Sequence, residues 1–285
     1  RVRCCRTSLN PDTTVMKKSL SSLLATALAA PLAAFAVDLA PALPGSYGTG
    51  GGSDALFVKI DDNWQGSTVL WDEATLSYGS GQPISDFAWG TGIWGIADWH
   101  ALIDQPTGQS GVIERWTGIA SQVNFGNTLY NAMYAAQWGT TLELPLSEPQ
   151  TNWLSRFDGY IRITEKSLYN FGVLYDDGFF FNLYGADGAM LSLVKDGVNP
   201  RDRLGFEQDI LLDVGLYRFQ LGAYNRLEAG VVDLRWSREG AADWTLVPTE
   251  NLLSLTQPLP VPEPATWWML LGGLGLIAVA ARRRT

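Results

Sequence analysis

The adjacent carboxylates of Asp176 and Asp177, followed by Gly178, are the side chains in this sequence best suited to chemistry. Neighbouring carboxylates repel one another unless a cation or hydrogen bonds compensate their charge. Calcium takes about six to eight oxygen ligands, so two neighbouring carboxylates could supply part of its coordination shell. Asp-Asp-Gly is also a common turn sequence, in which the carboxylates cap backbone amides. The pair therefore predicts a calcium site, with a capped turn as the alternative.

Other polar side chains offer less. His100 is the only histidine, so a Ser-His-Asp triad could be built only around it, and a role in the core or on the surface is favoured. The aromatic residues of 87–99 could offer rings to sugars, but we expect them to pack in the core. Asp61 and Asp62 form a second acidic pair on which nothing converges, which indicates a solvated turn.

The elements that must position these groups are predicted to be strands. In residues 169–175, 217–223 and 232–236, apolar or aromatic side chains occupy every second position. This period of two is typical of half-buried strands. Residues 128–137 are the one segment in which we expect a short helix. The body is therefore predicted to be all-β, as an antiparallel sandwich or barrel.

Turn sequences containing Asp or Glu and Gly separate the predicted strands, as expected of short antiparallel connections. They lie at residues 176–178, 186–188, 195–197 and 238–240.

The order of motifs resembles a known family. Phe157-Asp158-Gly159-Tyr160-Ile161 opens a strand, Tyr169-Asn170-Phe171 begins another, and Asp176-Asp177-Gly178-Phe179 follows at a tight turn. Tyr217-Arg218-Phe219, Tyr224-Asn225, Leu234-Arg235-Trp236-Ser237 and the segment 243–248 complete the series. The series resembles the lectin-like β-sandwich first named from anthrax protective antigen, well over residues 150–252 and less well over 65–150.

That resemblance implies a site. In sugar-binding members of the family, two adjacent aspartates at a strand end coordinate calcium together with an asparagine from a later loop, and sugar hydroxyls complete the shell. The matching residues here are Asp176, Asp177 and Asn225. Glu228 lies in the same loop as Asn225 and could add a ligand, although no motif position of the family supports it.

The N-terminus is typical of a secretory signal peptide. Met16 is followed by Lys17 and Lys18, a mostly apolar segment, and the small-x-small sequence that ends at Ala36. We therefore predict a signal peptide over residues 16–36, with an N-terminal membrane anchor as the alternative. Residues 1–15 are interpreted as an upstream extension from a start placed too early.

Both cysteines, Cys4 and Cys5, precede Met16. The exported protein would therefore carry neither a disulfide nor a thiolate metal site, and its stability would rest on its core.

The C-terminus combines three features in order: a Val-Pro-Glu-Pro motif, an uncharged stretch at 265–281 and three arginines. Seventeen residues span about 25 Å as a helix, which is enough for a short transmembrane helix. The arrangement resembles the PEP-CTERM sorting signal of Gram-negative bacteria, whose tail an exosortase is thought to process; a simple tail anchor is the alternative. The motif residues are Val261, Pro262, Glu263, Pro264, Arg282, Arg283 and Arg284.

The charge of the body limits its partners. Eight of the 20 Lys and Arg residues and two of the 29 Asp and Glu residues lie in the two terminal segments, so residues 37–260 hold 12 basic and 27 acidic residues, a net charge of −15. Such an acidic body argues against nucleic acid and anionic membranes as partners. It is compatible with calcium binding or with solubility alone.

Together these features predict residues 37–64 as an N-terminal lead-in, 65–255 as the lectin-like sandwich and 256–285 as the sorting tail. The expected function is that of a non-catalytic, calcium-dependent carbohydrate-binding or adhesion protein, sorted to the surface or matrix and associated with extracellular polysaccharide. A structural matrix protein without a specific ligand is the alternative. A glycoside hydrolase is less favoured, because no room remains for a separate catalytic domain.

Overall fold

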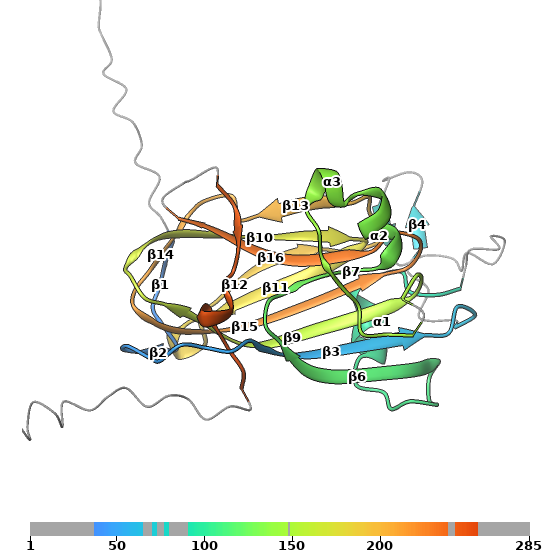
Figure 1. Ribbon diagram of the computed structural model, residues 1–285, viewed down its shortest axis with the longest axis horizontal. Coiled ribbons are helices and arrows are strands. Elements are labelled where there is room, and N and C mark those ends of the chain that lie inside the picture. The colour runs from blue at the N-terminus through green and yellow to red at the C-terminus, as the bar shows by residue number, and fades with distance from the viewer. Residues whose placement is uncertain are drawn as a thin grey trace, which may run out of the picture. The chain divides into compact units, whose positions relative to one another are not determined.

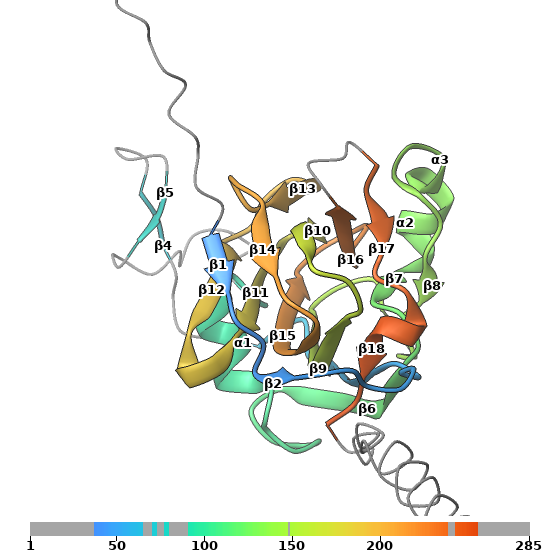
Figure 2. The same cartoon turned by 90° about the vertical axis from the view of Figure 1, so that its left-hand side faces the viewer.

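The computed structural model describes residues 37–64, 70–72, 77–79, 91–147, 149–238 and 243–255. All of them belong to one compact unit that begins at Ala36. The described residues form two eight-stranded sheets, stacked as layers, and one small two-stranded sheet (Figures 1 and 2).

The first sheet has the order β1-β14-β10-β16-β7-β8, with β13 paired to β10 and β17 paired to β16. Its strands are β1 (Val37–Leu39), β7 (Asn124–Gly126), β8 (Leu142–Glu143), β10 (Ser167–Asp176), β13 (Asp202–Gly205), β14 (Ile210–Leu212), β16 (Val231–Arg238) and β17 (Thr245–Leu246). The β1–β14 and β7–β8 pairs are parallel, and the other pairs of this sheet are antiparallel.

The second sheet has the order β12-β11-β15-β9-β3-β6, with β2 paired to β15 and β18 paired to β9, and all of its pairs are antiparallel. Its strands are β2 (Leu43–Pro44), β3 (Ser53–Ile60), β6 (Val112–Ala120), β9 (Trp153–Ile163), β11 (Gly178–Tyr184), β12 (Met190–Lys195), β15 (Gly215–Asn225) and β18 (Leu252–Leu253). The small sheet pairs β4 (Leu70–Asp72) with β5 (Ser77–Gly79).

The helices are short: α1 (Ile96–Leu102), α2 (Thr128–Met133), α3 (Ala135–Trp138) and the 3₁₀ turns η1 (Ala186–Gly188) and η2 (Thr249–Asn251). The helix predicted over residues 128–137 is confirmed as α2 and α3. Asn127 caps it, because its side-chain oxygen accepts a hydrogen bond of 2.8 Å from the Tyr130 amide.

The predicted antiparallel sandwich is confirmed, and its main strands follow the alternation in the sequence. The alternating residues of 169–175 and 217–223 lie on β10 and β15, and their apolar side chains enter the core between the sheets. Phe57 lies at the centre of that core, with its ring centroid 4.9 Å from Phe125 of the first sheet and 5.5 Å from Phe157 of the second. Because Phe57 belongs to the second sheet, its edge-to-face contact with Phe125 joins the two layers.

The predicted lead-in is different in the structure. Residues 37–64 supply β1, β2 and β3, and β3 lies between β6 and β9 in the second sheet. Side chains on both faces of β3 are buried, Phe57 toward the other sheet and Val58 toward α1, so the strand reads as a continuous apolar run without alternation. The glycine-rich segment before it is held as well, because Gly50 and Gly52 donate backbone hydrogen bonds to the chain around η2 and β18.

The aromatic stretch predicted as core, residues 87–99, is partly confirmed, because Trp99 of α1 is buried. Trp99 packs edge-on against Phe180 at 4.7 Å, and its indole N–H donates a hydrogen bond of 3.0 Å to the Ser155 carbonyl. The exposed His100 stacks on Phe180 at 5.6 Å. Phe87 and Trp89 lie outside the described residues.

The predicted segments 1–15, 16–36 and 256–285, with the expected transmembrane helix at 265–281, also lie outside the described residues. Within the part of the chain that the structure describes, no helix is long and apolar enough to cross a membrane.

Candidate functional site

The aspartate pair lies where the chain crosses from one sheet to the other. Strand β10 of the first sheet ends at Asp176, and β11 of the second sheet begins at Gly178. Asp177 forms the connection, its peptide bond to Asp176 is cis, and its amide donates a hydrogen bond of 2.9 Å to the Tyr224 carbonyl. A Cβ on Gly178 would come within 2.3 Å of the Tyr224 hydroxyl oxygen, so only glycine fits this crossing.

Asp177 is held by hydrogen bonds from Arg226 and Asn199. Its side chain accepts a hydrogen bond of 2.6 Å from the Arg226 amide, and its carbonyl accepts one of 3.2 Å from the Asn199 side chain. Asp177 is only 5% exposed, and this burial raises the pKa of its carboxyl to about 8. The Arg226 amide acts in the opposite direction, whereas the charge of Asp176 adds to the rise.

Asp176 has a cationic partner. Its Oδ2 accepts a hydrogen bond of 2.6 Å from Nη2 of Arg201, and both side chains are largely buried. Burial raises the pKa of Asp176 to about 7, although the guanidinium of Arg201 lowers it. The site therefore holds two buried carboxyls whose raised pKa values disfavour ionisation of both at once.

Asn225 offers a buried side-chain oxygen next to the β15–β16 loop. It is the last residue of β15 and has no exposed surface. Its side-chain nitrogen donates a long hydrogen bond of 3.5 Å to the Gln150 carbonyl, whereas its Oδ1 has no hydrogen-bond partner among the described residues. A buried amide oxygen without a partner costs about 1–3 kcal/mol, so this atom is a candidate ligand for a cation.

Glu228 lies in the loop between β15 and β16 and is exposed. Its backbone has a positive φ of 61°, and its carbonyl accepts a hydrogen bond of 2.6 Å from Asn127. Its charge adds to the rise in the pKa of both Asp176 and Asp177. The carboxylate of Glu228 therefore lies at the rim of the site and acts on the two aspartates through its charge.

A cavity of about 410 Å³ is lined by three of the four predicted site residues. The predicted residues that line it are Asp176, Asp177 and Glu228; Asn225 is not a lining residue and lies buried at the end of β15. The remaining lining residues are Tyr134, Val198, Asn199, Pro200, Arg201, Leu227 and Ala229. Sequence reasoning missed Tyr134 and Arg201, because nothing in the spacing shows that the helical segment and the loop before β13 meet over the β10–β11 turn.

The donor set fits calcium in kind. Two carboxylates and an unpartnered amide oxygen are hard oxygen ligands, and a cation would compensate the buried charge. Within the described ranges no three Asp, Glu, His or Cys side chains group closely enough to hold a metal ion. A calcium ion at this turn would therefore depend on amide, backbone and ligand oxygens in addition to the two aspartates.

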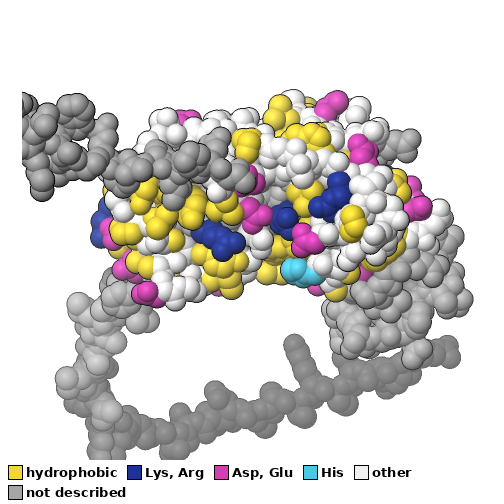
Figure 3. Space-filling view, turned by 90° about the horizontal axis from the view of Figure 1, so that it is seen from below, with side chains coloured by type: hydrophobic (Ala, Val, Ile, Leu, Met, Phe, Trp, Pro, Cys, Tyr) yellow, Lys and Arg dark blue, Asp and Glu magenta, His cyan; other side chains and the backbone are white. Residues whose placement is uncertain are grey.

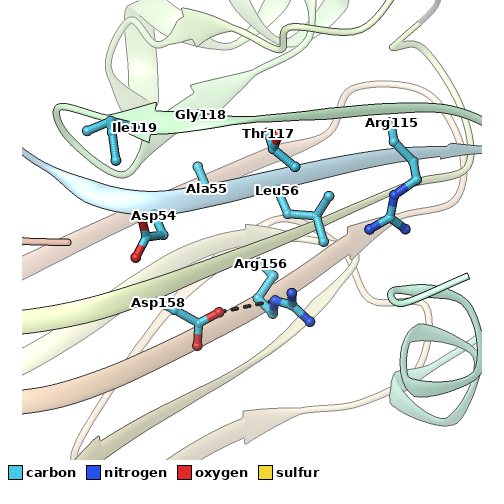
Figure 4. Close-up of a pocket in the computed structure, with 9 residues that line it drawn as sticks. All are labelled: Asp54, Ala55, Leu56, Arg115, Thr117, Gly118, Ile119, Arg156 and Asp158. Carbon is cyan, nitrogen blue, oxygen red and sulfur yellow. Dashed lines mark ion pairs between the residues drawn. The ribbon is translucent and has the colours of Figure 1, made fainter. Parts of the chain in front are cut away.

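A second cavity, of about 380 Å³, lies on the outer face of β3, β6 and β9 (Figure 4). Its charged side chains are already engaged. Arg156 pairs with Asp158 at 3.1 Å and with Asp104 at 2.7 Å, and Arg115 donates hydrogen bonds to two backbone carbonyls. In the view from below, charged and hydrophobic side chains are interspersed (Figure 3). We therefore take the first cavity as the candidate site.

The other acidic pair behaves as a turn. Asp61 accepts a hydrogen bond of 2.8 Å from the Asn63 amide, and Asp62 accepts bonds from Lys59 at 3.0 Å and Thr151 at 2.7 Å. Asp62 is exposed, as expected of a solvated turn. The expectation that nothing converges on this pair is wrong, because the side chain of Asn152 also donates to Asp62, at 2.9 Å, from a distant part of the chain.

The C-terminal segment matches the PEP-CTERM protein-sorting motif over residues 260–284. The chain carries this sorting motif. The predicted motif residues from Val261 to Arg284 fall within the match. No curated protein matches the chain.

Several solved structures are similar to the chain. The PA14 domain of the MpAFP antifreeze protein is 14% identical, with a TM-score of 0.44 over 75% of this chain and 96% of that one. The PA14 sugar-binding domain from an RTX adhesin is 11% identical, with a TM-score of 0.45 over 72% of this chain and 98% of that one.

The epithelial adhesin 6 A domain from Candida glabrata, solved in complex with Galb1-3GlcNAc, is 17% identical, with a TM-score of 0.44 over 79% of this chain and 97% of that one. Two of these three structures are described as PA14 domains, and the third as an adhesin domain.

Proposed function

We propose that this chain is an exported, surface-sorted, non-catalytic protein that binds polysaccharide through a calcium-dependent site at Asp176, Asp177 and Asn225. One observation carries the proposal. The buried oxygen of Asn225, at the end of β15, has no partner among the described residues, and β15 pairs with the start of β11, directly after two buried carboxyls of raised pKa. A bound cation would satisfy all three groups at once.

Each residue has a distinct part in this proposal. The carboxylates of Asp176 and Asp177 and the amide oxygen of Asn225 would hold calcium, which when bound supplies open coordination positions for vicinal sugar hydroxyls. The Arg226 amide orients Asp177 by its hydrogen bond of 2.6 Å. Glu228, at the rim of the cavity, would add a further oxygen ligand or meet the sugar itself.

The sorting motif supports delivery to the surface. An exosortase-type enzyme would process the tail between Val261 and Arg284, and the predicted helix at 265–281 would hold the chain in the inner membrane of a Gram-negative bacterium before that step. At the surface or in the matrix, extracellular polysaccharide is the ligand at hand, and calcium the available cation.

The test is retention of the purified chain on a glycan array, with calcium and with chelator. Asp177→Asn removes a charge and keeps the size of the side chain, and we expect it to abolish calcium-dependent retention. The matched control is Asp61→Asn, which removes a carboxylate from the other acidic pair and should leave retention unchanged.

Three results would contradict parts of this proposal. Equal retention in chelator, or by Asp177→Asn, would remove the calcium mechanism. A chain that binds no glycan and shows no calcium-linked rise in melting temperature would act as a structural matrix protein. Release of reducing ends from any bound glycan would show an enzyme.

A further inference from the structure

Arg201 occupies an unusual position in the wall of the candidate site. Its Nη2 donates to Oδ2 of Asp176 at 2.6 Å and to the carbonyl of Ala229 at 3.1 Å. Its guanidinium carbon lies 3.6 Å from the ring centroid of Tyr134. The Tyr134 ring and the Ala229 carbonyl are neutral supports, so this cation is held in the wall independently of Asp176.

The second buried cation at the site is Arg226. Its guanidinium carbon lies 3.9 Å from the ring centroid of Trp94, its Nη2 donates to the Thr91 carbonyl at 2.9 Å, and its charge lowers the pKa of Asp177. The buried carboxylates of Asp176 and Asp177 are thus already matched by two buried guanidinium groups. Glu228 is exposed at the rim of the cavity and lies outside this buried set.

Calcium would change this balance. Two carboxylates and two guanidinium groups carry no net charge, and adding a divalent cation leaves the buried set with an excess of two positive charges. Calcium would also compete with Arg201 for the carboxylate of Asp176, whereas the Tyr134 ring and the Ala229 carbonyl would keep the guanidinium in place. A buried excess of positive charge is costly unless an anion compensates it.

We infer that Arg201 makes the calcium-loaded site select acidic sugars, of the uronic acid class, over their neutral counterparts. The vicinal hydroxyls of the sugar would complete the calcium shell, and its carboxylate would take the guanidinium of Arg201 as its partner. Arginine suits this part because its planar guanidinium forms charge-assisted, bidentate hydrogen bonds with carboxylates. The inference rests on the proposed function and names the ligand class of that site.

The experiment compares sugars that differ only at carbon 6. The probes are methyl α-D-galactopyranosiduronic acid and methyl α-D-galactopyranoside, with the matching gluco and manno pairs, titrated into the full chain in saturating calcium. We expect the acid of at least one pair to bind about tenfold more tightly than its neutral partner, because the acid adds a charge-assisted hydrogen bond with Arg201.

Two variants separate this role from a loss of folding. Arg201→Gln should reduce the preference for the acid to about one, and yet bind calcium alone at least as tightly as the unmodified chain, because a cation beside Asp176 has been removed. Arg203→Gln is the matched control. Arg203 lies two residues along the chain with its guanidinium carbon 5.9 Å from the ring centroid of Trp138, and the preference should survive its loss.

The outcomes are distinct. Equal affinity for acidic and neutral sugars in calcium overturns the inference and leaves the proposed function standing. A preference that Arg201→Gln retains, or that Arg203→Gln also removes, overturns the role of Arg201. Failure of every probe to bind, with no binding of calcium, overturns the inference and the proposed function together.

Discussion

At the scale of single residues, the site combines two buried carboxyls whose pKa values lie well above the usual range. Burial raises the pKa of Asp176 to about 7 and that of Asp177 to about 8, whereas an aspartate in an unfolded chain titrates near 4. Between these values the folded protein binds protons that the unfolded chain has released. Without calcium, these two groups therefore stabilise the fold fully below about pH 4 and lose that contribution as the pH rises through about 7 and 8.

Calcium should reverse this trend, because it binds only the ionised carboxylates. We expect the calcium-induced rise in melting temperature to be small near pH 5.5 and to grow toward pH 8.5. Thermal unfolding at several pH values, with calcium and with chelator, measures it. Asp177→Asn should show little rise at either pH, and an equal rise at both pH values in the unmodified chain would contradict the assignment.

At the scale of elements, the site depends on two connections that meet. The β10–β11 crossing carries the aspartates, and the loop from β15 to β16 carries Asn225 at its start and Glu228 at its middle. Gly230 closes that loop: a Cβ at this position would lie 2.5 Å from Cγ of Asn225. The backbone of the loop therefore passes too close to the side-chain amide of Asn225, which we assign to calcium, for any residue other than glycine to fit.

Gly230→Ala should accordingly displace the Asn225 side chain. We expect calcium affinity to fall about tenfold or more and stability to fall by about 1–3 kcal/mol, as overpacking typically costs. Calorimetric titration with calcium and chemical unfolding measure the two effects.

The effect on calcium can be assigned to Asn225 by a double-mutant cycle. In a chain that already carries Asn225→Ala, Gly230→Ala should weaken calcium binding little further. If the two losses add in full, the glycine does not act through Asn225.

At the scale of the whole molecule, the two sheets are joined by an aromatic core that includes the N-terminal strand β3. Phe57 of this strand is fully buried and contacts rings from both layers. Removing it would leave a large cavity between the sheets, and Phe57 does not line the candidate site.

Phe57→Ala should therefore lower the free energy of unfolding by about 3–5 kcal/mol, while the folded fraction keeps its calcium affinity. Chemical unfolding measures the loss. Ile113→Ala on the neighbouring strand β6 is the control, because Ile113 is 51% exposed and its truncation should cost about 0.5 kcal/mol or less. Equal losses would show that β3 is no part of the core.

Much of the sandwich was predictable from the sequence, and the exceptions have a physical reason. Strands β10 and β15 bury alternate side chains between the sheets, so their period of two is visible in the residues. Strand β3 is covered on both faces, by the facing sheet and by α1, and its continuous apolar run gave no such signal. The glycines before it suggested flexibility, whereas their amides are fixed by backbone hydrogen bonds to a segment some 200 residues away.

For the site, residue types in local order were enough to single out the oxygen-bearing side chains proposed as calcium ligands and to locate the sorting motif. The sequence by itself could not determine the surroundings of the aspartates. Only the tertiary structure brings Tyr134 and Arg201 from separate segments to Asp176, and leaves the oxygen of Asn225 buried without a described partner. Contacts between distant segments are set by how the sheets and loops pack, and the charge balance that points to an acidic sugar arises from that packing.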